Sequence, residues 1–178
     1  AKKDEASKTA AQRIRNAGRT GRPGRPVRDQ VGPKNLDGAY AVQQINTDLW
    51  VKDGRRISGR KIGLTAKTVQ KQLGVDQPDY GILYADMEVV DGDEIATGRL
   101  MQPRAEGEIA LVLDDDLVDD QLTLVDLIEA TAYALPAIEV VGGRIAKWDI
   151  GIVDTIADNA SSGLYVLGTR PVGLHEID

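Results

Sequence analysis

Residues 104–116, RAEGEIALVLDDD, combine two closely spaced glutamates with an apolar run, and the rest of the sequence is considered around them. The apolar run Ile109–Leu113 contains no proline and ends at three aspartates, which is typical of a buried strand. Glu106 and Glu108 begin that run two residues apart, and residues i and i+2 of a strand project from one face. Two carboxylates about 5 Å apart repel by roughly 3 kcal/mol at an effective dielectric near 20. A fold accommodates such a pair by placing a cation between the carboxylates or by retaining protons, whereas on a surface strand water solvates both.

Glu139 lies inside a second apolar segment, Ala137–Val141, which we also expect to be a strand. A carboxylate buried without a partner is expensive, so a glutamate in such a strand is usually paired. If the two strands are neighbours, Glu139 joins Glu106 and Glu108. A ligand set made only of oxygen selects a hard divalent cation, Mg²⁺ or Mn²⁺, rather than zinc. The spacing therefore raises the hypothesis of a divalent metal site, with solvated glutamates as the alternative.

Two further residues are candidates for chemistry. Lys61, within RKIGLT (60–65), stands in a partly apolar segment, where a lysine either pairs with a carboxylate or loses its proton readily. Asp79 follows a proline in a turn and is a candidate general base. The alternatives are a strand-edge lysine with its ammonium in water and a turn aspartate bonded to its own backbone. His175, the only histidine, is near the chain end and we expect it at the surface.

The composition is that of a globular protein, with 178 residues and 42% hydrophobic content. There is no cysteine, which excludes disulfides, thiolate metal sites and cysteine nucleophiles. No apolar run is long enough for a membrane span, and the N-terminus has no hydrophobic centre of a secretion signal. These features predict a soluble, cytoplasmic protein that does not bind membranes.

Basic residues are concentrated at the N-terminus although the net charge is −6. Residues 1–28 hold nine lysines and arginines against two acidic residues, and no aromatic side chain on which a base could stack. We therefore expect a solvated or subunit-contacting arm rather than a nucleic-acid-binding segment. The predicted division is an N-terminal basic helix and loop arm, residues 1–34, followed by a catalytic domain, residues 35–178.

Capping, turn and periodicity signals predict the order of the elements. They are a helix over 5–17, a loop over 18–34, a helix over 36–51 capped by Asn35, an extended segment over 55–63, a helix over 66–73 capped by Thr65 and ended by Gly74, a short strand over 82–84, a helix from Thr123 to about Tyr133 ended by Pro136, and a strand over 137–141.

Four blocks, in order, carry a resemblance to a known family. They are GRKIGLTAKTVQKQLGVDQPDYG (59–81), LMQPRAEGEIALVL (100–113), PAIEVVGGRI (136–145) and DTIADNASSG (154–163). These blocks closely resemble the 2-keto-4-pentenoate hydratases, also called 2-hydroxypenta-2,4-dienoate hydratases, of the fumarylacetoacetate hydrolase superfamily. The resemblance implies an α+β fold, a mixed β-roll or barrel core with flanking helices. It also implies Mg²⁺ or Mn²⁺ held by Glu106, Glu108 and Glu139, and a homo-oligomer.

The family's activity lies in the meta-cleavage degradation of aromatic compounds. The resemblance implies hydration of 2-hydroxypenta-2,4-dienoate to 4-hydroxy-2-oxopentanoate. We expect Lys61 and Asp79 to act as the acid–base pair. Asn159 and Ser161 are expected to bond the substrate carboxylate or the attacking water.

Three alternatives accompany this interpretation. The 4-oxalocrotonate decarboxylases of the same superfamily are similar in fold and metal ligands, but QLGVDQPDYG (72–81) resembles the hydratase branch more. Acylpyruvate hydrolases share the Glu-x-Glu pattern without the match around Lys61 and Asn159. Family members are longer, so we expect a C-terminal part to be missing. The third alternative, from another class of function, is a non-catalytic partner, a truncated or accessory subunit that stabilises a paired pathway enzyme.

Overall fold

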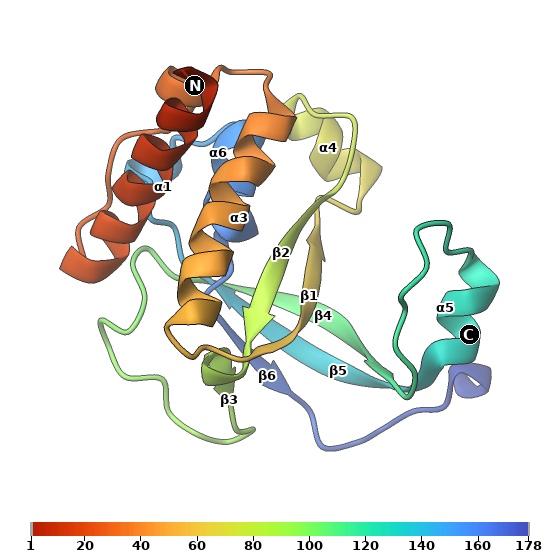
Figure 1. Ribbon diagram of the computed structural model, residues 1–178. Helices are drawn as coiled ribbons and strands as arrows, with labels where there is room; N and C mark the ends of the chain where they lie inside the picture. The colour runs from red at the N-terminus through yellow and green to blue at the C-terminus, as the bar shows by residue number, and fades with distance from the viewer. Residues whose placement is uncertain (1, 178) are drawn as a thin grey trace.

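Two small sheets and a layer of helices make up the architecture of the computed structural model, which describes residues 2–177 (Figure 1). The larger sheet has the order β3-β6-β5-β4, in which only β3 and β6 are parallel, and β1 and β2 form an antiparallel pair. The strands are β1 Ile57–Gly63, β2 Asp79–Tyr84, β3 Glu88–Val89, β4 Arg104–Leu113, β5 Thr131–Val141 and β6 Leu164–Leu167. The described residues thus have a mixed α/β fold with two separate sheets, and closure into a β-roll stays a prediction.

The helices lie mainly at one end of the sheets, with α1 beside α3 and α3 beside α6 (Figure 1). The α-helices are α1 Lys2–Thr20, α2 Arg28–Val31, α3 Leu36–Lys52, α4 Lys67–Leu73, α5 Leu124–Ala130 and α6 Ile152–Ala157; short 3-10 helices are η1 Ala85–Met87, η2 Ala146–Trp148, η3 Asn159–Ser161 and η4 Leu174–Glu176. No helix within residues 2–177 has the length and apolar composition that a bilayer span requires.

Local signals predicted the helix ends with mixed success. Asn35 caps α3 as predicted, since its Oδ1 accepts a hydrogen bond of 3.0 Å from the Gly38 amide. Gly74 ends α4 in the left-handed conformation, at φ 66°. Thr65 is not a cap: α4 begins at Lys67, so the N-cap is Ala66, which has no side-chain acceptor. The threonine stands one residue too early for its hydroxyl to reach the free amides of the first turn.

The inner face of α1 belongs to a hydrophobic core shared with α3 and α6. This core consists of Ala10, Ala11, Ile14, Val27, Ala39, Val42, Val153, Ile156 and Ala157. The expectation of a solvated or subunit-contacting arm is therefore wrong for this face, because alanine and isoleucine at helical spacing have found a partner surface. The predicted loop over 18–34 also contains α2, and the Gly24 amide bonds the Arg144 carbonyl at 2.8 Å. The domain boundary at residue 34 stays a prediction.

Pro136 lies inside β5 and does not end a helix, contrary to the prediction. α5 ends at Ala130, and β5 then runs for eleven residues through the proline. The Pro136 carbonyl accepts a hydrogen bond of 2.8 Å from the Gly168 amide. In an antiparallel strand the N–H and C=O of one residue point to the same neighbouring strand. The nitrogen of Pro136, which carries no hydrogen, therefore faces β6, whose pairing with β5 ends at Leu167. No hydrogen bond to β4 is lost, and the strand tolerates the proline.

The apolar half of β4 is exposed, whereas the sequence predicted a buried strand. Ile109 is 67% exposed and Leu111 is 42% exposed. A run rich in leucine and β-branched residues indicates a strand. Whether that strand is buried depends on another layer packing against it, and the sequence of the strand itself does not show this. The prediction of the strand is confirmed, and the prediction of its burial is wrong for the described residues.

Candidate metal centre

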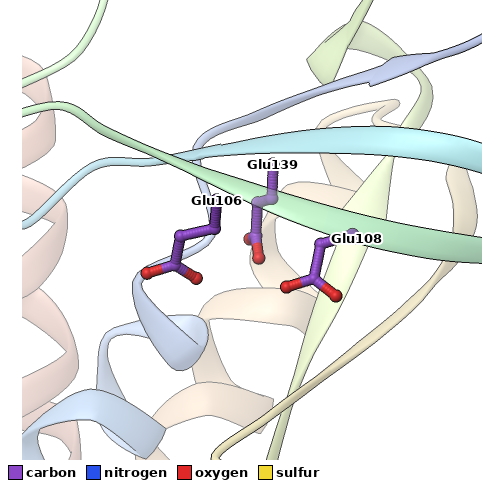
Figure 2. A group of neighbouring side chains, drawn as sticks. All are labelled: Glu106, Glu108 and Glu139. Atoms are coloured by element: carbon purple, nitrogen blue, oxygen red, sulfur yellow. The ribbon is translucent and has the colours of Figure 1, made fainter.

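The β4–β5 register brings the three glutamates together. Glu106 pairs directly with Glu139, and Glu108 is two residues further along the same face of β4. Each side chain offers a carboxylate oxygen, and these three oxygens lie within 4.8 Å of one another. Figure 2 shows the carboxylates leaving the two strands toward the same side. The structure thus brings together the residues that the sequence singled out as possible ligands.

Glu139 is the buried member of this group, with 6% of its surface exposed, while Glu106 and Glu108 are exposed. Its Oε2 forms an ion pair of 3.0 Å with Lys61 Nζ. Burial raises the pKa of Glu139, an effect that the Lys61 charge opposes and the two neighbouring glutamates reinforce. Its Oε1 is buried and has no hydrogen-bond partner among the described residues.

The ligand chemistry of the three carboxylates and the unpartnered oxygen of Glu139 suit a metal ion. Three carboxylates supply only hard oxygen ligands, which match Mg²⁺, Mn²⁺ or Ca²⁺. The buried, unpartnered Oε1 of Glu139 needs a donor or a cation, since an unpaired buried acceptor is costly. The residues therefore fit a divalent cation.

The β1–β2 pair brings the second predicted pair of residues to this site. Lys61 pairs with Gly81 and Asp79 with Gly63, so both residues are near the same end of the pair. A Cβ added at Gly63 would collide with Asp79 Oδ1 and lie 3.7 Å from Lys61 Nζ, so this glycine leaves the space that the two side chains use. Burial raises the pKa of Asp79, and the nearby Lys61 charge counteracts the rise. One ammonium thus faces two buried carboxylates.

Asn159 and Ser161 differ in what their side chains do. Asn159 Oδ1 accepts from the Ile82 amide at 2.7 Å, and its Nδ2 donates to the Ile82 carbonyl at 2.8 Å. Its amide is therefore used to hold β2. Ser161 Oγ is buried and has no partner among the described residues. Asn159, Ala160 and Ser161 all have left-handed backbones, at φ 56°, 50° and 56°. Such strain at successive non-glycine residues is commonly found at functional sites.

Two buried aspartates are held by arginines. Asp154 is fully buried, and its carboxylate accepts from the Val27 and Arg28 amides and from the Arg28 guanidinium at 2.6 Å. Asp158 forms an ion pair of 3.1 Å with Arg144, and burial raises its pKa to about 6. Sequence reasoning missed Asp154, although aspartates spaced four apart beside isoleucine and alanine were a usable signal of buried carboxylates.

Sequence reasoning also missed Arg104. It stands two residues before Glu106, so the same strand spacing that paired the glutamates puts it on their face. Its guanidinium carbon lies 4.5 Å from the centre of the Trp148 ring. His175, by contrast, is exposed as predicted.

Comparisons with known proteins were made on sequence and on structure. No protein-family model matches the chain. It is 56% identical over 173 residues to 2-keto-4-pentenoate hydratase 2 of Dechloromonas aromatica strain RCB, which covers 97% of this chain and 66% of that protein. It is 54% identical over 175 residues to the 2-keto-4-pentenoate hydratase of Burkholderia vietnamiensis strain G4, covering 98% and 67%. The 2-hydroxyhexa-2,4-dienoate hydratase of Comamonas testosteroni is 41% identical over 164 residues, covering 91% and 62%.

Among solved structures, the 4-oxalocrotonate decarboxylase from Pseudomonas putida G7, complexed with magnesium and adipate, superposes with a TM-score of 0.90 at 31% identity. The match covers 98% of this chain and 66% of that one. The chain thus spans about two thirds of the length of the relatives that it matches.

Proposed function

The chain belongs to the 2-keto-4-pentenoate hydratase family, and from this we propose that the protein hydrates 2-hydroxypenta-2,4-dienoate to 4-hydroxy-2-oxopentanoate in meta-cleavage catabolism of aromatic compounds. The observation that carries the proposal is the meeting of three carboxylates, from β4 and β5, beside the buried Lys61–Glu139 ion pair. Relatives named as hydratases of pentenoate and hexadienoate substrates support the substrate class.

Glu106, Glu108 and Glu139 would hold the divalent metal, for which we propose Mg²⁺ or Mn²⁺. The solved decarboxylase is complexed with magnesium, which supports this assignment. When bound, the metal would supply Lewis-acid stabilisation of the negative charge that develops on the 2-oxygen of the substrate. Glu139 contributes the buried Oε1 to the set, and the ion pair of Lys61 with its Oε2 orients the carboxylate.

Lys61 and Asp79 are the proton carriers in this proposal. The dienol becomes a ketone by gaining a proton at C5 and releasing the enol proton; water then adds at C4 and C3 gains a proton. Lys61 Nζ delivers protons to carbon, and Asp79 takes up protons from the enol hydroxyl and the attacking water. Burial suits Asp79 to this task, because a raised pKa makes its carboxylate a better base.

Ser161 is proposed to bind the substrate carboxylate or the attacking water, since its buried hydroxyl has no partner among the described residues. Asn159 is better suited to supporting the site, because both ends of its amide bond Ile82. A β-roll core, homo-oligomerisation, association with a paired pathway enzyme and a cytoplasmic location stay predictions.

A steady-state assay tests the proposal and its main rival. The chain's fold matches a decarboxylase at a TM-score of 0.90, so decarboxylation of 4-oxalocrotonate is the second candidate function. With Mg²⁺, we expect loss of the dienol ultraviolet absorbance and no CO₂ from 4-oxalocrotonate. Release of CO₂ without hydration would overturn the hydratase proposal.

Two further measurements separate a catalyst from a non-catalytic partner subunit. A competent site at 100 times its dissociation constant for Mg²⁺ gains about 2.7 kcal/mol of stability, so the thermal midpoint should rise. Lys61→Met should lower turnover about 10²–10⁴-fold while Mg²⁺ affinity changes little. An unchanged turnover would remove Lys61 from the mechanism.

A further inference from the structure

Arg104 is an exposed residue of β4 on the same strand face as Glu106 and Glu108. Strand alternation directs it to the face of Glu106 and Glu108, and its guanidinium stacks over Trp148 at 4.5 Å. No residue among 2–177 for which side chains are described forms an ion pair or hydrogen bond with this guanidinium. Stacking uses the face of the guanidinium, so the N–H donors around its edge stay available.

The support beneath the guanidinium is fixed. Trp148 lies against Gly143, where an added Cβ would come 3.3 Å from the indole ring. Gln102 Nε2 donates to the carbonyls of Gly143 and Ile145 at 3.0 and 2.8 Å, and its Oε1 accepts from the Lys147 amide at 2.7 Å. These bonds tie the segment before β4 to the segment after β5. The indole is therefore held as a platform and is not a freely moving surface ring.

Backbone strain marks the same place. Gln102, Lys147 and Trp148 have φ values of 50°, 61° and 54°, in the left-handed region that L side chains rarely adopt. Non-glycine residues keep such conformations only where the surroundings over-determine them, and they cluster at ligand-binding sites. All three belong to the platform under Arg104.

The charges explain what this arginine is for. It forms no ion pair with Glu106, so it does not neutralise the cluster. The positive charge of Arg104 repels a divalent cation bound at the glutamates, so on its own this arginine weakens metal binding. An anionic ligand that binds between the metal ion and Arg104 attracts both positive charges and so offsets the repulsion between them. The planar fork of N–H donors matches a carboxylate in a bidentate manner.

We infer that Arg104, stacked on Trp148, binds the carboxylate of the substrate and restricts the site to anionic 2-oxo and 2-hydroxydienoic acids. The inference rests on the proposed function and deepens it. It assigns Arg104 a substrate-binding role, with Trp148 and Gln102 as positioning residues. Esters and amides of the same carbon skeleton would lack the charge that the guanidinium recognises.

Ligand binding to the Mg²⁺-saturated full chain tests the inference without turnover. The probes are pyruvate and its uncharged methyl ester, measured by titration calorimetry. Arg104→Gln should weaken pyruvate binding about 10–100-fold and change methyl pyruvate binding less than about twofold. Arg104→Lys keeps the positive charge but loses the bidentate guanidinium, so its affinity for pyruvate should lie between those of the parent and Arg104→Gln. Arg170→Gln is the matched control, because Arg170 is exposed and distant in sequence from the cluster.

Trp148→Leu is a second variant, which keeps Arg104 but removes its platform. It should weaken pyruvate binding about 3–10-fold by leaving the guanidinium unpositioned. In turnover of the dienol, Arg104→Gln should raise KM with kcat within a few-fold, and its Mg²⁺ affinity should be equal to or tighter than that of the parent.

The outcomes separate this inference from the proposed function. If Arg104→Gln binds pyruvate as tightly as Arg170→Gln does, the inference is overturned and the hydratase proposal can stand. If the parent protein binds pyruvate through Arg104 but converts no dienol, the inference stands and the hydratase proposal fails. A parent protein that binds neither probe overturns both.

Discussion

The two ends of the β4–β5 pair have opposite chemistry, and in neither does hydropathy alone decide which side chains are buried. At the acidic end, residues 104–108 and 137–141, Glu139 is buried against Lys61. At the apolar end, residues 109–113 and 131–136, Ile109 is 67% exposed. Hydropathy alone predicts the reverse. Burial along a strand therefore follows its neighbours in space: Glu139 is covered where Lys61 of β1 reaches it, and β1 lies over this part of the sheet in Figure 1.

The largest expected effect is on activity at the acidic end. Glu139→Gln removes one carboxylate of the cluster and should lower turnover at least about 10³-fold, since a Lewis acid contributes several kcal/mol of transition-state stabilisation. Leu111→Gln, at the apolar end of the same β4–β5 pair, should leave turnover within about twofold because its side chain is 42% exposed. Both are measured at saturating Mg²⁺, with metal affinity titrated separately. Equal losses in the two variants would break the comparison.

Stability should show the same asymmetry. Lys61→Met leaves Glu139 buried without its cation, and breaking such a pair costs about 3 kcal/mol in the metal-free protein. Ile109→Gln should change the free energy of unfolding by less than about 0.5 kcal/mol, since that side chain is mostly in solvent already. Urea unfolding without metal measures both. Because the Mg²⁺ affinity changes little, added Mg²⁺ should stabilise the parent and Lys61→Met by similar amounts, and no stabilisation of either would argue against a cation held at Glu139.

The predictable parts of this molecule depended on local signals. The Asn35 cap, the Gly74 stop and the same-face spacing of Glu106 and Glu108 are short-range features, and the structure bears them out. Glu139 was predictable because a glutamate in an apolar strand needs a partner. Such local signals predicted the three clustered glutamates and four of the helices, α1, α3, α4 and α5, though not every boundary.

The parts that sequence reasoning missed depend on contacts between distant segments. Pro136 is tolerated in β5 only because its nitrogen faces the side where β6 ends. Arg104 meets Trp148 through a loop tied by Gln102, and nothing in the local pattern of either residue indicates the contact. Asp154 is buried because Arg28, more than a hundred residues earlier, reaches it. Tertiary pairing decides each of these cases.

The pH dependence of stability tests the burial of Asp158. Asp158 is bonded to Arg144, which follows the acidic end of β5, and burial raises its pKa in the folded protein from the usual 3.8 to about 6. A raised folded pKa stabilises the protein below about pH 4, and this contribution is lost as pH rises through about 6. The stability of the parent relative to Asp158→Asn should therefore fall by about 2 kcal/mol between pH 4 and 7. Urea unfolding of both proteins across this range measures it, and parallel curves would contradict the burial of a titrating carboxyl.

The smallest expected effect concerns α5, beside the apolar end. Thr123 and Asp126 form a capping box there, in which the Thr123 amide donates to Asp126 Oδ2 at 2.6 Å. Thr123→Ala should cost about 1 kcal/mol of local helix stability, so amides of residues 124–130 should exchange with solvent about fivefold faster. Leu124 and Val125 are 71% and 59% exposed, so α5 shares little packing through which this loosening could spread. Turnover and Mg²⁺ affinity should accordingly match those of the parent. A loss of either would mean that the two ends of the β4–β5 pair are energetically coupled.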